Sequence, residues 1–194
     1  MKKTVIAIIF LAGFYFAGFS QMVIKPAIGM NFTSLSNDPL SYETTGRMGW
    51  QIGGTIAMGD QFYFEPGIFW EKNNWNLQNI DPQVPEFKND LSAIKIPIFV
   101  GINVVGDAND NNFHIMGGPT MRIITDVNPG STGKTKDDFS DFIFGMDIGA
   151  GISMGKIFID AGYEWGLTNI YKDETNDIRS RGFWLNAGFR LKFL

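Results

Sequence analysis

A single histidine and a few scattered carboxylates are the residues of this chain that could perform acid–base chemistry. His114 opens an alternating segment, where a lone histidine is better explained as an interior or turn residue than as a general base. Asp141, Asp147 and Glu164 could form a carboxylate pair, but nothing in the sequence places them at catalytic distance. The chain has no cysteine, which excludes disulfides, thiolate zinc sites and a cysteine nucleophile. We expect no catalytic residue, no metal site and no cofactor.

A polar run at residues 107–112 is superficially similar to a calcium-binding loop, because it reads Asp-Ala-Asn-Asp-Asn-Asn. It lacks the glycine that such a loop needs at its sixth position and the glutamate at its twelfth. We interpret this run as a polar turn between two strands.

Charged residues of both signs recur on one face of the alternating segments, where glycine is also frequent. Glycine is unfavourable on an exposed strand surface, but it suits places where backbones approach closely. If the segments close into an eight-stranded barrel, the interior is only wide enough for side chains. We therefore predict a packed, ion-paired lumen and no channel. The predicted lumen charge network consists of Lys25, Glu65, Lys95, Arg122, Asp147, Asp160, Glu164 and Arg190.

The elements that must position these charges are eight segments in which apolar and polar residues alternate. A period of two places the two sets on opposite faces of a strand. The clearest segment carries only isoleucine and valine in its apolar phase, from Ile94 to Val104. Segments of about 10 to 13 residues match a tilted transmembrane strand, whereas soluble strands are about half as long. The eight segments span residues 22–32, 48–58, 62–71, 93–104, 113–124, 142–154, 157–167 and 183–194.

The links between these segments alternate in length. Long links are expected near 33–47, 72–92, 125–141 and 168–182, and short ones near 59–61, 105–112 and 155–156. Long extracellular loops and short periplasmic turns are typical of outer-membrane barrels, and closure leaves no exposed strand edge. We predict an all-β fold, an eight-stranded antiparallel up-and-down transmembrane barrel over residues 21–194. Its apolar phase should face lipid, and both chain ends should lie on the periplasmic side.

Tryptophan distribution gives an independent indication of membrane insertion. Trp50, Trp70 and Trp165 are predicted to form an aromatic belt at the extracellular end, because indole rings favour the headgroup level of a bilayer. Trp75 and Trp184 are expected at the same end.

Residues 1–20 have the pattern of a secretory signal peptide. Two lysines precede an apolar run that is short for a membrane-spanning helix, and Gly18 and Ser20 provide small residues before the expected cleavage site. The formal net charge is −4, which gives no indication of nucleic-acid binding. We expect the mature chain in the outer membrane of a Gram-negative bacterium, with the lipid bilayer as its first partner.

Several short motifs, in their order along the chain, are similar to those of the PorT-like outer-membrane β-barrel proteins. Residues 163–170 read Tyr-Glu-Trp-Gly-Leu-Thr-Asn-Ile, close to that family's Arg-Tyr-x-x-Gly-Leu-x-Asn-Ile, with Gly162 in place of the arginine. Residues 94–98 resemble its Leu-x-Ile-Pro-Leu strand, and residues 117–119 its Gly-Gly-Pro-Tyr, with Thr120 in place of the tyrosine. Residues 190–194 resemble a C-terminal strand signal for barrel assembly. The resemblance implies an outer-membrane barrel, with some members tied to protein secretion, and supplies no catalytic residues.

Three functions remain open at this level. The first is a non-enzymatic outer-membrane barrel, a structural or accessory component in which the extracellular loops contact a protein partner. The second is a soluble, lipocalin-like barrel that holds a small apolar ligand, and the third is an outer-membrane enzyme. For the first, the link at 72–92 supplies the candidate contact residues Trp75 and Phe87.

Overall fold

The computed structural model describes residues 22–35, 42–79, 87–106, 111–128, 136–172 and 178–193. The predicted signal peptide, residues 107–110 of the polar turn and the tip of the link at 72–92 lie outside these residues. The described residues include no helix long and apolar enough to span a bilayer.

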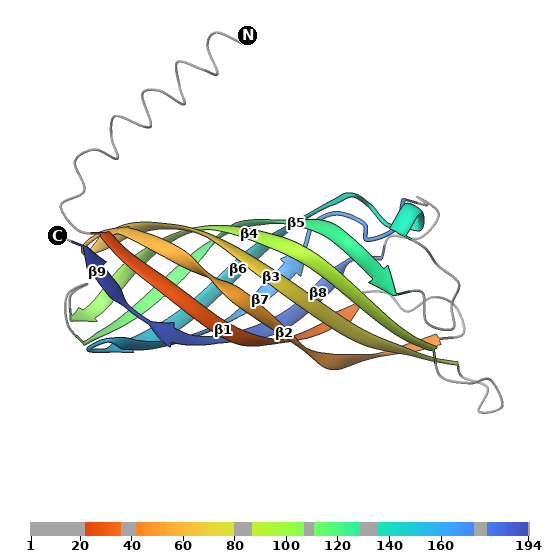
Figure 1. Cartoon of the computed structure of the whole chain (residues 1–194), viewed down its shortest axis with the longest axis horizontal. Coiled ribbons are helices and arrows are strands. Elements are labelled where there is room, and N and C mark those ends of the chain that lie inside the picture. The colour runs from red at the N-terminus through yellow and green to blue at the C-terminus, as the bar shows by residue number, and fades with distance from the viewer. Residues whose placement is uncertain are drawn as a thin grey trace, which may run out of the picture.

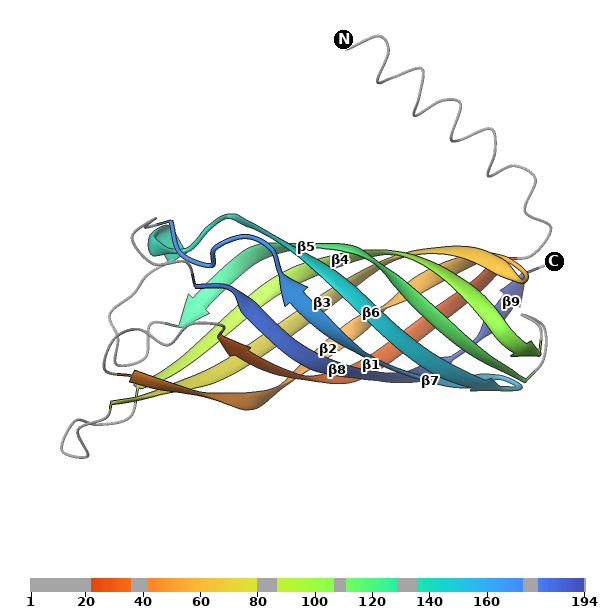
Figure 2. The same cartoon turned by 180° about the vertical axis from the view of Figure 1, so that it is seen from behind.

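The strands form one closed antiparallel barrel, which confirms the predicted fold (Figures 1 and 2). Each strand pairs with its neighbour in sequence, and β1 closes the ring by pairing with both β2 and β8. A break at Arg190 separates β8 from the short β9, which pairs with the start of β1 and completes the eighth position of the wall. The strands are β1 (Met22–Leu35), β2 (Tyr42–Gly59), β3 (Phe62–Asn79), β4 (Phe87–Gly106), β5 (Asn112–Asn128), β6 (Phe142–Met154), β7 (Ile157–Gly166), β8 (Ser180–Phe189) and β9 (Leu191–Phe193).

One side of the barrel wall is much taller than the sequence pattern predicted. Strands β2 to β5 contain 18, 18, 20 and 17 residues, whereas β6, β7 and β8 contain 13, 10 and 10. The predicted long links at 33–47 and 72–92 are therefore largely strand, and that part of the prediction is wrong. Backbone pairing continues past the membrane, for instance from Trp75 to Asn89, where a strand in water no longer needs apolar residues at alternate positions.

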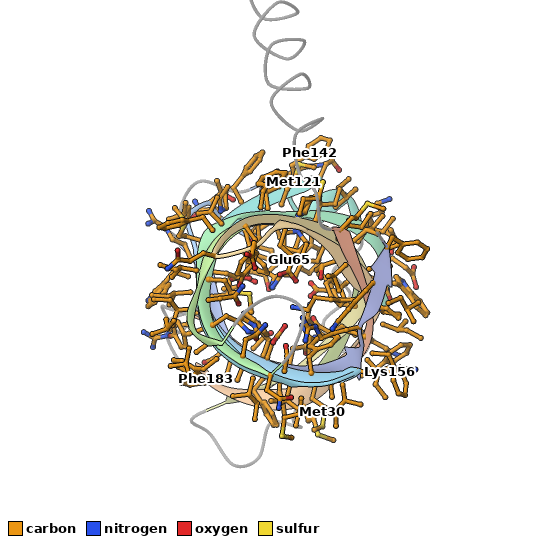
Figure 3. The ribbon with its side chains drawn as sticks, turned by 90° about the vertical axis from the view of Figure 1, so that its left-hand side faces the viewer. Met30, Glu65, Met121, Phe142, Lys156 and Phe183 are labelled. Carbon is orange, nitrogen blue, oxygen red and sulfur yellow. The ribbon has the colours of Figure 1, made fainter. Side chains whose placement is uncertain are left out.

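The two faces of the wall differ as the alternation predicted. Apolar side chains such as Phe62, which is 70% exposed, and Ile28, which is 66% exposed, point outward, and charged side chains are buried inside. Viewed along the barrel, Glu65 points into the lumen whereas Met30, Met121 and Phe142 point away from it (Figure 3). This confirms that the apolar phase faces outward. The lipocalin-like alternative would require the opposite arrangement, with an apolar interior.

Three short turns lie at the end of the barrel where β1 begins. Each carries a glycine with positive φ, namely Gly59 at 125°, Gly106 at 77° and Gly155 at 57°. Such backbone is unfavourable for residues with a Cβ and typical of tight hairpins. β1 begins and β9 ends at this same short-turn end (Figure 1), which in outer-membrane barrels is the periplasmic one.

Candidate functional site

The lumen contains one charge cluster near the periplasmic end. The Lys25 Nζ lies 2.9 Å from Glu65 Oε1 and 2.9 Å from Asp160 Oδ2, so that β1 is joined across the interior to β3 and β7. The Thr55 hydroxyl donates to the same Glu65 oxygen at 2.5 Å. The ammonium group also lies 4.5 Å from the ring centre of Phe158. Because all these charges are buried, each depends on its partners to offset desolvation.

His114 belongs to this periplasmic cluster. Its Nε2 lies 3.0 Å from Asp160 Oδ1, and its Nδ1 lies 3.0 Å from Asn112 Oδ1. A general base would need a free ring nitrogen facing a nucleophile, and both nitrogens of His114 are engaged. Ser153 lines the same small cavity, but the histidine has no nitrogen left to activate its hydroxyl. The arrangement positions strands β5 and β7 and is poorly suited to acid–base chemistry.

A second charge cluster lies further toward the extracellular end. The Lys95 Nζ lies 2.6 Å from Glu164 Oε2 and 3.0 Å from Asp147 Oδ2. Arg122 pairs with Glu71 and with Glu164, donating from Nη2 to Glu164 Oε2 at 2.7 Å. These contacts join β3, β4, β5, β6 and β7 through the centre of the barrel.

Of the three carboxylates that the sequence offered as a possible pair, Asp147 and Glu164 thus meet at Lys95, where both are held in ion pairs. Asp141 lies apart and exposed, 3.5 Å from Lys172 Nζ. Within the described part of the chain, no set of three or more histidine and carboxylate side chains could hold a metal ion.

The predicted charge network is therefore divided into two clusters, and Arg190 lies on the periplasmic side, where it lines the same cavity as Lys25 and Glu65. It is buried at the break between β8 and β9, where its Nη1 donates to the Gly155 carbonyl at 3.4 Å. Lys192 on β9, beyond the break, is exposed, as are Leu191 and Phe193.

Aromatic side chains also cross the lumen. Trp184 on β8 stacks on Phe99 of β4, with ring centres 6.1 Å apart and planes 13° apart. The indole lies in a notch where Gly149 and Gly162 have no side chains, since a Cβ on Gly162 would lie 2.3 Å from its Cζ2. Trp184 therefore does not join the belt tryptophans on the outer surface. Its neighbour Phe183 occupies the outward phase, so Trp184 must point inward, and it is only 5% exposed.

The three tryptophans of the predicted belt lie on the outer surface. Trp50 and Trp70 are in edge-to-face contact with ring centres 5.2 Å apart, and Trp165 lies 4.7 Å from the ring of Tyr163. Trp75 and Phe87 belong to the part of the β3–β4 hairpin that extends beyond this belt. The side chains of these two residues lie outside the described set.

A cluster of buried apolar residues, here called the cap, lies at the extracellular end of the lumen. A short 3-10 helix, η1 (Lys136–Asp138), leads into Phe139, which bridges to Tyr171 with ring centres 4.9 Å apart. The Ser140 amide donates to the Ile170 carbonyl at 2.8 Å, so the two predicted links at 125–141 and 168–182 are joined to each other. Burial raises the pKa of the Tyr171 hydroxyl to about 12. The cap comprises Leu91, Ala93, Ile124, Val127, Phe139, Ile143, Ile170, Tyr171 and Ile178.

Little space remains inside the barrel. One cavity of about 30 Å³ lies among Lys25, Tyr63 and His114, and another of about 10 Å³ lies among Asn31, Glu71 and other residues. A single water needs roughly 10–15 Å³ measured in this way, so these cavities hold a few waters at most. The described residues therefore fill the interior with ion pairs, aromatic contacts and the cap.

A closed barrel with an apolar exterior, an aromatic belt and a charged interior defines an integral outer-membrane β-barrel protein. The sequence agrees: residues 10–172 match the family described as "Outer membrane protein beta-barrel domain", and the chain belongs to that family. It is accordingly a protein of the Gram-negative outer membrane. A comparison with curated proteins gave no significant match.

The fold is similar to that of solved structures, among them the following two. The outer membrane protein OprG from Pseudomonas aeruginosa is 12% identical, with a TM-score of 0.60, over 89% of this chain and 95% of that one. Neisserial surface protein A is 15% identical, with a TM-score of 0.55, over 89% and 97% of the two chains. At this identity the similarity concerns the fold alone.

Proposed function

We propose that this protein is a non-enzymatic outer-membrane barrel that acts as a structural or accessory component of the cell envelope. The observation that carries the proposal is the interior, in which Lys25, Lys95 and Arg122 each join carboxylates from two strands. A lumen that is cross-linked by ion pairs and capped by apolar residues makes the barrel rigid and is poorly suited to transport. Function then resides in the parts that project from the membrane.

Planar-bilayer recording tests the closed interior. Purified protein reconstituted at a low number of copies should give no steady ohmic conductance, because the ion pairs and the cap leave no continuous water path. Removing the cap contacts with Phe139→Ala should leave the bilayer silent as well, since the two charge clusters and the Phe99–Trp184 contact still fill the lumen. A stable open channel in the parent protein would contradict this function.

The finer part of the proposal follows the PorT-like motifs. We infer an accessory role in protein secretion or assembly, with the tall β3–β4 hairpin as the contact surface for a protein partner. Support comes from the pairing of β3 with β4 out to Leu77 and Phe87, which carries the hairpin beyond the belt tryptophan Trp70. A paired ribbon can present side chains to a partner more rigidly than an unpaired loop.

Co-purification from native membranes tests the hairpin as a partner site. Residues 77–87 are removed, and the paired positions Asn76 and Lys88 are rejoined through an Asn-Gly turn. The shortened barrel should fold, because the membrane-embedded pairing is untouched, and its heat-sensitive gel mobility reports this. It should lose the proteins that the intact chain retains. A shortened barrel that keeps every partner would place the contact surface elsewhere.

A further inference from the structure

A hollow lies on the outer, lipid-facing surface of the described strands. It has a volume of about 350 Å³ and its lining is almost entirely apolar. It crosses three strand pairs, from β3 to β6. The side chains around it are those of Phe62, Val100, Ile102, Ile115 and Ile148, with Gly117 between them. We call it the Gly117 groove.

The groove exists because one position in the outward row of β5 has no side chain. Gly117 pairs with Val100 on one side and with Ile148 on the other, so all three positions belong to the same face. A Cβ on Gly117 would approach the Asp147 carbonyl oxygen at 3.0 Å and nothing else closer than 3.8 Å. Space that an isoleucine or valine would fill elsewhere on the wall is therefore empty of protein atoms.

The depth of the groove in the membrane follows from the register. Phe62 comes directly after the turn at Asp60 and Gln61, and it pairs with Ile102, which in turn pairs with Ile115. This lower row lies at the short-turn, periplasmic end. The next row of outward-facing residues toward the extracellular end contains Val100, Gly117 and Ile148. The groove thus faces the periplasmic leaflet, where the surrounding solvent is phospholipid.

The width of the groove favours one kind of occupant. Val100 on β4 and Ile148 on β6 are two strand spacings apart, about 10 Å between backbones before their side chains reach inward. An α-helix with its side chains is about 10–12 Å across and does not enter such a space. A β-strand needs a free edge, and the closed wall offers none at this depth. A single acyl chain enters it and gains the dispersion contacts that an empty hollow loses.

We propose that the Gly117 groove is a seat for one acyl chain of a periplasmic-leaflet phospholipid, held in a fixed place against the barrel. The groove is open to the lipid-facing surface, and its floor is the backbone of Gly117. Elsewhere on that surface side chains such as Ile28 and Phe183 project outward and are 66% and 64% exposed. Over Gly117 an acyl chain would lie between the side chains of Val100 and Ile148. This seat is independent of the closed lumen and of the hairpin contact.

Photolabelling in vesicles tests the seat. The full chain is reconstituted in phosphatidylethanolamine vesicles in which some lipid carries a diazirine midway along one acyl chain, and adducts are mapped by mass spectrometry. Labelling in the parent should concentrate on the segments that contain Val100, Ile115 and Ile148. Gly117→Leu fills the groove and should lower that labelling several-fold. Ala161→Leu, which adds bulk to an exposed outer position on β7, should leave it unchanged.

Ile148→Trp provides a second way to fill the groove, from its opposite wall and without touching Gly117, should the leucine variant fail to fold. It should lower labelling in the same manner. Adducts spread evenly around the parent barrel, or unchanged in both filling variants, would overturn the proposal. Protein–protein cross-links at Val100 and Ile148 that displace lipid labelling would overturn it too, because the occupant would then be a second copy.

Discussion

Over most of the outer face of the barrel, with the exception of positions such as Gly117, apolar side chains repeat at every second position and none needs a particular neighbour. On the inner face of the same strands, each large or charged side chain meets a specific partner from another strand. Ile98 is half exposed to lipid, whereas Lys95, three residues earlier, is buried between two carboxylates. On the outer face only the apolar character of the side chains matters, whereas on the inner face each side chain depends on specific contacts.

This difference indicates that the inner face, and not the outer face, contains the contacts that are specific to this fold. Lipid accepts any apolar shape, so isoleucine, phenylalanine and methionine are interchangeable outside. Inside, Trp184 requires two glycines, and Arg122 requires two glutamates. Substitutions that keep a residue apolar should therefore be tolerated on the outer face. Substitutions of similar size on the inner face should lower the free energy of unfolding.

The largest effect is expected from Lys95→Met. The substitution keeps the side-chain volume and removes the cation shared by Asp147 and Glu164. Breaking a buried ion pair in this way costs about 3–5 kcal/mol, because the remaining charge has no compensation. Urea unfolding from vesicles, followed by tryptophan fluorescence, measures the loss.

The double variant Lys95→Met with Asp147→Asn is the matched control for this prediction. It also removes the carboxylate whose ion pair is with Lys95, while Glu164 keeps Arg122. Much of the lost stability should return. If the single variant unfolds like the parent, the inner face is not held by its ion pairs and the comparison fails.

Ile98→Arg tests the outer face and should have the next largest effect. A charge placed among lipid at mid-membrane costs about 2–4 kcal/mol, whereas Ile98→Leu keeps the composition and costs less than about 1.5 kcal/mol. The same unfolding experiment reports both. An arginine that is tolerated as well as leucine would mean that this position does not face the hydrocarbon.

The fold was predictable because its determinants are local. A period of two, an even number of segments and the lengths of the turns each follow from neighbouring residues, and closure follows from the need to satisfy strand edges. The predicted strands differ from the structure at the break at Arg190 and where the strands extend beyond the extracellular side of the membrane. There the backbone of β2 to β5 keeps pairing although the apolar alternation has stopped.

The partners across the lumen were not predictable in the same way. That Lys25 meets Glu65 and Asp160 depends on the stagger of the strands around the whole barrel, which no single segment encodes. Two signals were nevertheless present in the sequence. Trp184 stands out of phase with Phe183, which already places it inside, and the glycines at 149 and 162 leave room for a large ring.

Gly162→Ala tests the packing of the inner face by adding a single methyl group. The added carbon would meet Trp184 Cζ2 at 2.3 Å and the Ile148 carbonyl oxygen at 2.6 Å, and the second of these cannot move freely. Overpacking of this kind costs about 1–3 kcal/mol. Gly117→Ala adds the same methyl group on the outer face and should be nearly neutral. Equal losses in both variants would show that backbone effects, and not the notch for Trp184, determine the choice of glycine.

The smallest expected effect on the free energy of unfolding comes from Tyr171 in the cap, and it occurs only at alkaline pH. Burial raises the pKa of the Tyr171 hydroxyl to about 12 in the folded protein, whereas the unfolded chain ionises near about 10. Below about pH 10 the phenol is neutral in both states, and its contribution to stability is fully present. As the pH rises toward about 12, only the unfolded state loses the proton, so the free energy of unfolding falls by about 1.4 kcal/mol per pH unit.

Tyr171→Phe has no proton to lose, and its stability should fall less steeply than that of the parent over this range, with little difference between the two slopes at neutral pH. Urea titrations of both proteins in vesicles measure the difference in slope, which cancels the contributions of the other tyrosines and of the lysines. Parallel curves for parent and variant would mean that Tyr171 is open to water, and the extracellular end of the lumen would then be closed by the inner ion pairs alone.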